Sequence, residues 1–161
     1  MNGQHNYSLT IKWTGNNGSG TSGYRAYERS HTITADNKQE IQASSDPVFR
    51  GDKTKYNPED LFVASLASCH MLSYLHACVV AGVVVTDYVD TATGTMIETS
   101  NGGGHFTEVN LHPLVTVADK SMVDKANALH EKASEMCFIA SSVNFPVKHH
   151  PVCKVAENKL I

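Results

Sequence analysis

The sequence predicts an α+β fold with a mainly antiparallel sheet of about six strands and two long helices. Strand-like and helix-like segments follow the order βββ-α-ββ-α-β, without the βαβ alternation that produces a parallel sheet. Stretches rich in Gly and Asn separate consecutive strands, as turns do. With 161 residues, 41% of them hydrophobic and 18% charged, the chain is expected to form one domain over residues 1–161.

Three strands are predicted before the first helix, at residues 7–13, 24–34 and 39–44. The first of them, YSLTIKW, alternates between polar and apolar side chains. A glycine-rich segment at residues 14–23 joins it to the second strand. Because this segment leads into a strand and not into a helix, we interpret it as a hairpin loop and not as a phosphate-binding loop.

The first helix is predicted over residues 57–81. Asn57 is a suitable N-cap, Pro58 fits the first helical position, and Gly82 is typical of a residue that ends a helix. No Asp, Glu, Lys or Arg occurs from Leu61 to Thr86. A helix that is apolar on nearly every face predicts a central element buried on nearly all sides.

The same apolar run exceeds the ~20 residues needed to cross a bilayer, so a membrane span is the alternative. Glu59 and Asp60 occupy the first turn, where acidic side chains stabilise the positive end of a helix dipole. The sequence after Gly82 is rich in β-branched residues and predicts a strand. We therefore expect a core helix and no membrane contact.

The second half of the chain predicts two long strands near residues 83–98 and 105–117, joined by the hairpin-forming sequence SNGGG. A second helix is predicted over residues 119–142, with Asp119 as its N-cap. A last strand is expected over residues 144–158, broken by Pro151 because proline lacks the N–H that a sheet requires.

Charge and composition exclude some classes of partner. The formal net charge is −3, which provides no broad basic surface for a nucleic acid. The first residues, MNGQHNYSLTIKW, lack the apolar core of an export signal, so a cytoplasmic location is expected. Thiols stay reduced in that compartment, and the four cysteines are expected to be free, catalytic or metal-bound.

The positions of the cysteines suggest one pair. Cys69 and Cys78 lie nine residues apart on the first helix and point to opposite sides, so they cannot bond to each other. Cys69 and Cys137 are each expected near the middle of a separate helix, and packing of the two helices would bring their sulfurs together. The alternative is that free cysteines are small buried apolar residues, and Cys78 and Cys153 keep that interpretation.

Two other chemistries fit the spacing poorly. His76 follows Cys69 by seven residues and His130 precedes Cys137 by seven, which is ~10 Å along a helix and too far for one metal ion. No CxxC or HxxxH motif is present, so no metal is expected. A Cys–His hydrolase is disfavoured because His70 points about 100° away from Cys69 around the helix.

The segments NPEDLFVASLASCH and EMCFIASSVNFPV, together with the order of strands and helices, resemble the OsmC/Ohr family of osmotically induced and organic-hydroperoxide-resistance proteins. The resemblance extends over nearly the whole chain. It implies an OsmC-like fold in which two α+β chains form an intertwined homodimer with two active sites at the interface.

The resemblance also implies roles for individual residues. Cys69 matches the peroxidatic cysteine, Cys137 the resolving cysteine, and Glu59 the catalytic glutamate of the family. The family also uses an arginine from the early strands. We favour Arg29 for this role over Arg25, which lies in the same region.

Arg50, in the loop before the first helix, is a further candidate for that arginine. An arginine suits the role because it never loses its proton and can pair with a carboxylate and a thiolate together. His70 is a departure from the family pattern, since typical members have Phe directly after the first cysteine.

The implied activity is that of a cysteine-based peroxidase, an antioxidant enzyme of the oxidative stress response that reduces organic hydroperoxides. A Cys69 sulfenic acid would be followed by a Cys69–Cys137 disulfide, and an external dithiol, in the family often a lipoylated protein, would reduce it. No metal or organic cofactor is implied. The alternative is a non-catalytic dimer of the same fold that binds a small hydrophobic ligand in a pocket at its interface.

The spacing of Glu59 and Cys69 bears on how such a site could assemble. Ten residues along one helix correspond to ~15 Å of rise, which a glutamate side chain cannot bridge. The intervening sequence LFVASLAS contains no Gly or Pro that would break the helix. We therefore expect Glu59, and with it Arg29, to act on Cys69 of a partner chain.

Overall fold

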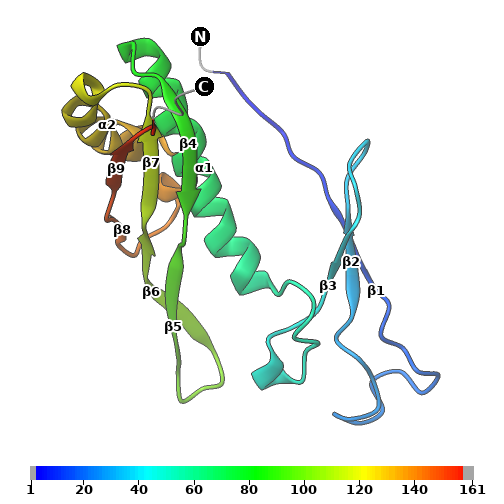
Figure 1. Cartoon of the computed structure of the whole chain (residues 1–161). Helices are drawn as coiled ribbons and strands as arrows, with labels where there is room; N and C mark the ends of the chain where they lie inside the picture. Colours follow the sequence, from blue (N-terminus) through cyan, green and yellow to red (C-terminus); the bar gives the residue numbers. More distant parts are fainter. Residues whose placement is uncertain (1–2, 158–161) are drawn as a thin grey trace. The chain divides into compact units, whose positions relative to one another are not determined.

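The computed structural model describes residues 3–157 and divides into two compact units, Met1–Phe62 and Val63–Ile161. Nine strands, two α-helices and three short 3-10 helices are assigned within the described residues (Figure 1). Helix α1 crosses the boundary between the units. Each unit is described by itself below, and the single domain expected from the sequence stays a prediction.

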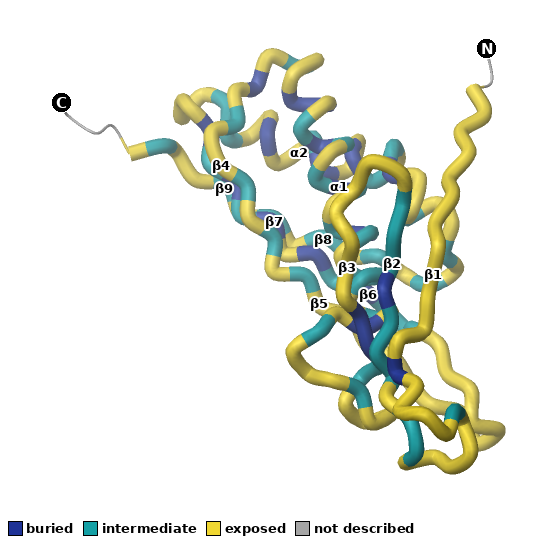
Figure 2. The backbone as a smooth tube through the Cα atoms, turned by 90° about the vertical axis from the view of Figure 1, so that its right-hand side faces the viewer, coloured by how far each residue is buried: buried dark blue, intermediate teal, exposed yellow. Residues whose placement is uncertain are grey.

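The first unit contains a three-stranded antiparallel sheet of β1 (Thr10–Trp13), β2 (His31–Thr34) and β3 (Ile41–Ala43), in that order. The register aligns Ile11, Ile33 and Ile41 across the three strands, so these side chains share one face. Much of this face is exposed along β1 (Figure 2). The sheet therefore has an apolar face that this unit leaves largely uncovered.

The second strand is shorter than the sequence predicts. It begins at His31, and residues 24–30 before it form turns and a bridge between Tyr27 and Asn16. In this segment the side chain of Arg29 hydrogen-bonds to nearby carbonyls, which a regular strand would not permit. The prediction that Arg29 and Arg25 lie on a strand is therefore wrong.

Helix α1 (Pro58–Ala81) has the bounds expected from its caps. The Asp60 N–H donates to Oδ1 of Asn57 at 2.7 Å, and the Asn57 N–H donates to Oδ2 of Asp60 at 3.3 Å. At the other end Gly82 adopts φ +72°, and the N–H groups of residues 82 and 83 return to the carbonyls of Val79 and Cys78. Local sequence therefore defines both ends of the helix.

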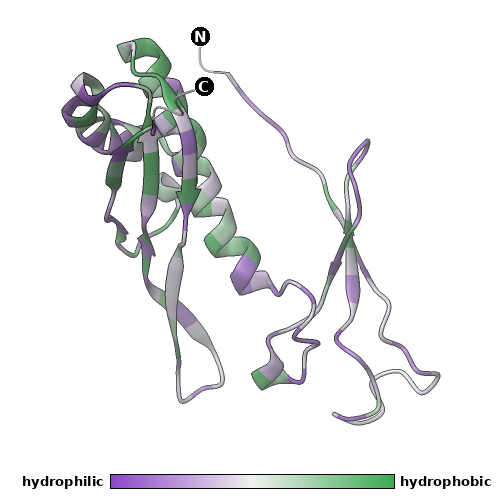
Figure 3. Cartoon of the chain, in the orientation of Figure 1, coloured by the Kyte–Doolittle hydropathy of each residue, from purple (hydrophilic) through white to green (hydrophobic). Residues whose placement is uncertain are grey.

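The expectation that α1 is buried on nearly all sides is wrong for a single chain. Only one face is buried, consisting of Leu66, His70, Tyr74, Ala77 and Cys78. Hydrophobic residues extend over most of the helix after its polar first turn (Figure 3). Away from this face Leu72, Val79 and Val80 are exposed. By length and composition alone α1 could cross a membrane, but its buried polar residues contact other parts of the same unit.

The two long strands predicted after α1 are each interrupted. The structure has β4 (Val85–Asp90) and β5 (Thr93–Glu98) in place of the first, and β6 (Gly104–Leu111) and β7 (Pro113–Val117) in place of the second. Strands β4 and β7 pair in one sheet, and β5 and β6 pair in another. At the interruption Oδ1 of Asp90 accepts the N–H of His112 at 2.7 Å, and Pro113 has no N–H to donate.

The last predicted strand also forms two pieces, β8 (Val147–His149) and β9 (Val152–Val155), divided near Pro151 as expected. The final residue of the predicted range, 158, lies outside the described residues. Strand β8 runs parallel to β6, and β9 runs parallel to β7. The second unit therefore has two mixed sheets, ordered β4-β7-β9 and β5-β6-β8, in place of one mainly antiparallel sheet.

Helix α2 (Val123–Met136) is shorter than predicted. Asp119 is a cap as expected, because its Oδ1 accepts the N–H of Ser121 at 2.8 Å, but it begins a 3-10 turn, η2 (Lys120–Met122). Cys137 follows the last helical residue with an extended backbone of φ −78° and ψ 104°. The expectation that Cys137 lies near the middle of a helix is therefore wrong.

The core of the second unit lies where α1 and α2 meet the β4-β7-β9 sheet. One cluster of buried residues joins these elements: Tyr74, Cys78, Val83, Val115, Val117, Ala126 and Ala133. Helix α2 contacts β9 at the edge of this sheet (Figure 1). These contacts hold the two helices together and so position the residues that each presents to the other.

Candidate functional site

The second unit brings two of the four cysteines into contact. Cys69 comes from α1 and is half-buried, whereas Cys137, directly after α2, is only 1% exposed. The two thiols lie within hydrogen-bonding reach of each other. All four cysteines are free thiols in this structure. The pair expected from the sequence is thus assembled, although the end of α2 and not its middle supplies the second thiol.

The surroundings of Cys137 favour its protonated form. Burial first, and then its hydrogen bond with Cys69, raise the pKa of the Cys137 thiol to about 11. The Ala140 N–H lies 3.4 Å from the Cys137 sulfur, and this backbone contact lowers the pKa by a smaller amount. Cys137 therefore stays a thiol at neutral pH, and Cys69 is the member of the pair that solvent can reach.

Glu59 occupies the first turn of α1 and is half-buried. Within the described residues its carboxylate has no ion pair and no assigned hydrogen bond. The helix runs without interruption from Pro58 to Ala81, so Glu59 and Cys69 are separated by ~15 Å along its axis. The structure therefore does not bring Glu59 to the thiol of its own chain.

Arg29 is held rigidly within the first unit. Its Nη1 donates to the carbonyl oxygens of Tyr24 at 3.0 Å and Tyr27 at 2.8 Å. Its Cζ lies 4.5 Å and 4.2 Å from the centres of the same two rings, as in cation–π contacts. Its Nη2 is buried and has no partner among the described residues. The two N–H groups of Nη2 thus have no assigned acceptor in the described part of the chain.

The other two arginines are less constrained. Arg50 approaches only the Tyr24 ring, at 6.0 Å, from a backbone position with φ +67° after the 3-10 turn η1 (Pro47–Phe49). Within the described part of the chain, Arg25 has no assigned ion pair or ring contact. Of the three candidate arginines, Arg29 makes the most hydrogen bonds and ring contacts through its guanidinium group.

Three imidazoles, of His70, His130 and His149, form a stacked and hydrogen-bonded group that the sequence did not predict. Nε2 of His70 lies 3.0 Å from Nδ1 of His130, and both residues are buried. The ring of His149 stacks on His70 at 4.3 Å, and the ring of Tyr74 stacks on His130 at 3.9 Å. The available signal was the polar pair His70 and Tyr74, one turn apart on one face of an apolar helix.

All three histidines are neutral at physiological pH. Burial lowers the pKa of His70 to about 3 and that of His130 to about 4, and each is also lowered by neighbouring imidazoles. Burial lowers the pKa of His149 as well. Uncharged rings can pack against one another at these distances, whereas protonated rings would repel.

The described residues 3–157 contain no group of three or more His, Cys, Asp and Glu side chains arranged to hold a metal ion. The geometry of the three histidines explains why they do not form such a site. The His70 and His149 rings are stacked with an angle of 30° between their planes, so their in-plane lone pairs do not converge on one point. The nitrogens that do face each other, on His70 and His130, are joined by a hydrogen bond.

The remaining cysteines serve the core. Cys78 is buried in the central cluster, and Cys153 on β9 packs against that cluster. Burial raises the pKa of both thiols, which opposes formation of a reactive thiolate. This arrangement agrees with the interpretation of both as packing residues.

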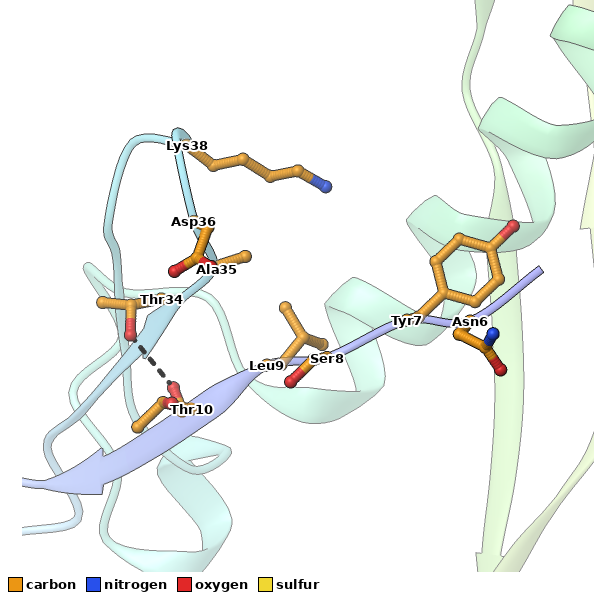
Figure 4. Close-up of a pocket in the computed structure, with 9 residues that line it drawn as sticks. All are labelled: Asn6, Tyr7, Ser8, Leu9, Thr10, Thr34, Ala35, Asp36 and Lys38. Carbon is orange, nitrogen blue, oxygen red and sulfur yellow. Dashed lines mark hydrogen bonds between the residues drawn. The ribbon is translucent and has the colours of Figure 1, made fainter.

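A surface pocket in the first unit does not contain the thiols. Its lining is drawn in Figure 4 and consists of Asn6, Tyr7, Ser8, Leu9, Thr10, Thr34, Ala35, Asp36 and Lys38. The Thr34 hydroxyl donates to the Thr10 carbonyl at 3.5 Å, which joins the two sides of the pocket. The pocket is open and contains no cysteine or histidine. It therefore offers no group for thiol chemistry.

Comparison with known proteins places this arrangement in a family. A family model described as OsmC-like protein matches residues 51–150, a segment that includes α1, both paired cysteines and His70, His130 and His149. The chain belongs to the OsmC-like protein family. Among curated proteins, none matches the sequence.

Solved structures of OsmC-like proteins share the fold. An OsmC-like protein of unknown function from Vibrio cholerae is 30% identical, with a TM-score of 0.83, 92% of this chain covered and 100% of the other. An organic hydroperoxide resistance protein from Elizabethkingia anophelis is 19% identical, with a TM-score of 0.69 and coverage of 97% and 100%.

A third OsmC-like structure, from Legionella pneumophila, is an organic hydroperoxide resistance protein that is 22% identical, with a TM-score of 0.66 and coverage of 94% and 100%. At this identity the likeness shows the fold alone. The α+β class and the family expected from the sequence are confirmed.

Proposed function

We propose that this OsmC-like protein is a thiol-dependent peroxidase that reduces organic hydroperoxides. The observation that carries the proposal is the contact between Cys69, which solvent can reach, and Cys137, which is buried. A thiol that reacts with a substrate must be accessible, whereas a resolving thiol must be close to it. Membership of a family with named organic hydroperoxide resistance proteins supports this assignment.

In the first step the Cys69 thiolate attacks the terminal oxygen of the hydroperoxide. The O–O bond breaks, the alkoxide takes a proton and leaves as an alcohol, and Cys69 becomes a sulfenic acid. The Cys137 thiol then loses its proton and attacks the Cys69 sulfur, the S–O bond of the sulfenic acid breaks, the hydroxide takes that proton and leaves as water, and a disulfide forms. An external dithiol reduces the disulfide and returns both thiols, so the cycle uses no metal or organic cofactor.

Activation of Cys69 requires a cation, because an ordinary thiol pKa near 8.5 leaves little thiolate at neutral pH. Cys69 lies far beyond the first turn of α1, where the helix dipole has little effect. The guanidinium of Arg29 is a suitable cation for the thiolate because it never loses its proton, and Glu59, which has no assigned partner among the described residues, is a carboxylate that can pair with it. We assign these two roles to Arg29 and Glu59.

We further propose that the working form is a homodimer in which Arg29 and Glu59 act on Cys69 of the partner chain. The unbroken α1 keeps Glu59 ~15 Å along the axis from the thiol of its own chain. The exposed residues Leu72, Val79 and Val80 on α1, and the exposed apolar face of the first sheet, are surfaces that a second copy would cover.

The substrate class follows from the apolar character of the surroundings. Helix α1 contains no charged side chain beyond its first turn, so an alkyl or aryl hydroperoxide fits better than hydrogen peroxide. The reductant has to be a dithiol from a reducing compartment, and we place the protein in the cytoplasm. Small aryl hydroperoxides such as cumene hydroperoxide are suitable probes.

The decisive experiment counts free thiols before and after one equivalent of cumene hydroperoxide under non-reducing conditions. We expect two thiols to be lost per chain and peptide mapping to find a Cys69–Cys137 disulfide. The variants Cys78→Ser and Cys153→Ser serve as matched controls and should behave like the unmodified protein. If no thiol is lost, the protein is not a peroxidase, and the alternative of a non-catalytic dimer that binds a small hydrophobic ligand replaces this proposal.

A further inference from the structure

Two buried polar contacts join α1 to α2. The first is the hydrogen bond between Nε2 of His70 and Nδ1 of His130, at 3.0 Å. The second runs from the Tyr74 hydroxyl to the carbonyl oxygen of Ala126, at 3.2 Å. Both are fully buried in an interface that is otherwise apolar. Polar contacts in such an interface define how two helices align more sharply than apolar contacts do.

The two contacts are spaced by one turn on each helix. His70 and Tyr74 are four residues apart on α1, and Ala126 and His130 are four apart on α2, in the opposite chain direction. Together they specify one alignment of the two helices. A slip by one turn, ~5.4 Å, would break both contacts and leave their polar atoms buried without partners.

The rings of the histidine pair are also held in orientation. The His70 and His130 planes differ by only 12°, as expected for a hydrogen bond that lies in the plane of both rings. The ring of His149 covers the face of His70, and the ring of Tyr74 covers the face of His130. Neither imidazole can turn away without displacing an aromatic neighbour.

This alignment is directly connected to the thiol pair. His70 is the residue that follows Cys69 on α1, and His130 lies on α2, whose C-terminal cap is Cys137. The position of α2 along α1 therefore decides whether the buried Cys137 meets Cys69. Besides the hydrogen bond between the two thiols, the hydrogen bonds assigned to Cys137 within the described residues stay in adjacent turns of its own chain, with Ser134, Ala140 and Ser141.

We propose that His70 and His130 are positioning residues that align α1 with α2 and so bring Cys137 to Cys69 for disulfide closure. They act on the second step of the cycle and leave the attack on the hydroperoxide unaffected. The inference rests on the proposed function in one respect: it takes the Cys69–Cys137 disulfide to be a step of the peroxidase cycle. The alignment itself is independent of any peroxide, since it concerns only the approach of two thiols.

The test separates the two steps by rapid mixing with cumene hydroperoxide. Trapping of the sulfenic acid measures the first step, and loss of the trappable species measures closure. In His70→Phe and in His130→Leu we expect the first step at the unmodified rate and closure slower by about tenfold, equivalent to ~1.4 kcal/mol, the size of one buried hydrogen bond. His105→Phe, at an exposed position of β6, is the matched control and should change neither step.

Conservative variants distinguish alignment from general loss of structure. His70→Gln places an amide nitrogen near the former Nε2, and His130→Asn places a polar atom near the former Nδ1, so each should restore most of the closure rate. The double variant His70→Phe/His130→Leu removes both polar partners and should recover thermal stability, because no buried donor is orphaned. Its closure should remain slow, since only the contact between the Tyr74 hydroxyl and the Ala126 carbonyl is then left to align the two helices.

Closure can also be measured without a hydroperoxide. Diamide oxidises the reduced pair: one thiolate adds to its N=N bond, the second thiol displaces the adduct, and a hydrazine leaves as the disulfide forms. The same order of rates is expected among the variants. If the unmodified protein closes with diamide but forms no sulfenic acid with peroxide, the proposed function fails and the inference stands. If the Phe and Leu variants close as fast as the unmodified protein with both oxidants, the inference is overturned.

Discussion

At the scale of single residues, the two thiols of the pair are chemically distinct. Cys69 is accessible, whereas burial and the contact with Cys69 raise the pKa of Cys137 to about 11. Cys137→Ser should therefore react once with cumene hydroperoxide and accumulate a Cys69 sulfenic acid, and Cys69→Ser should not react. A dimedone-type probe with peptide mapping checks this. Labelling of Cys78 or Cys153 would show that the roles are misassigned.

The raised pKa of Cys137 also predicts how disulfide closure depends on pH. Only the thiolate attacks the sulfenic acid, and its fraction rises about tenfold per pH unit while the pH stays well below the pKa. The closure rate should therefore increase about tenfold per unit between pH 7 and pH 9. Rapid mixing of pre-formed sulfenic acid with buffer at each pH measures it. A closure rate that does not change over this range would contradict the assigned environment of Cys137.

At the scale of single elements, α1 depends on the reciprocal cap between Asn57 and Asp60. Asn57→Ala removes the acceptor of a 2.7 Å hydrogen bond and should lower the free energy of unfolding by about 1 kcal/mol. Urea denaturation followed by circular dichroism measures the change. Ser100→Ala, in the exposed hairpin loop, is the control, and an equal effect in both variants would argue against the cap.

The packing of α1 on α2 and β8 predicts loss of stability in acid. His70 and His130 have pKa values of about 3 and about 4 when folded, below the usual 6.5, and that of His149 is lowered too. The unfolded chain therefore takes up protons first, and the free energy of unfolding should fall as pH decreases from 6.5 towards 4. Denaturation at several pH values measures the slope. It should be shallower in His70→Phe/His130→Leu, and an unchanged slope would show that these residues are not buried neutral histidines.

At the scale of the whole molecule, the proposed homodimer has a specific consequence for activity. Glu59→Ala and Cys69→Ser chains should each be inactive as homodimers. When the two are refolded together, each heterodimer should contain one site with an intact Glu59 and an intact Cys69, and about half of the heterodimer sites should work. Peroxide turnover by heterodimers isolated through different affinity tags measures this. An active monomer by sedimentation, or no recovery in verified heterodimers, would contradict the shared site.

The sequence by itself determined the features that depend on neighbouring residues. The bounds of α1 follow from Asn57, Pro58 and Gly82, because capping uses hydrogen bonds within one turn. The family follows from a short motif around Cys69 and a second around Cys137. The order of strands and helices follows from the periodicity of apolar residues, which is also local.

Only the tertiary structure decided what depends on residues far apart in the chain. The interruption of the long strands, the parallel pairing of β8 and β9, and the position of Cys137 at the end of α2 all follow from contacts between elements. The contact of His70 with His130 spans sixty positions. A histidine in an apolar helix looks the same in sequence whether it is unpaired or hydrogen-bonded, because its partner is selected by packing and burial, which periodicity does not encode.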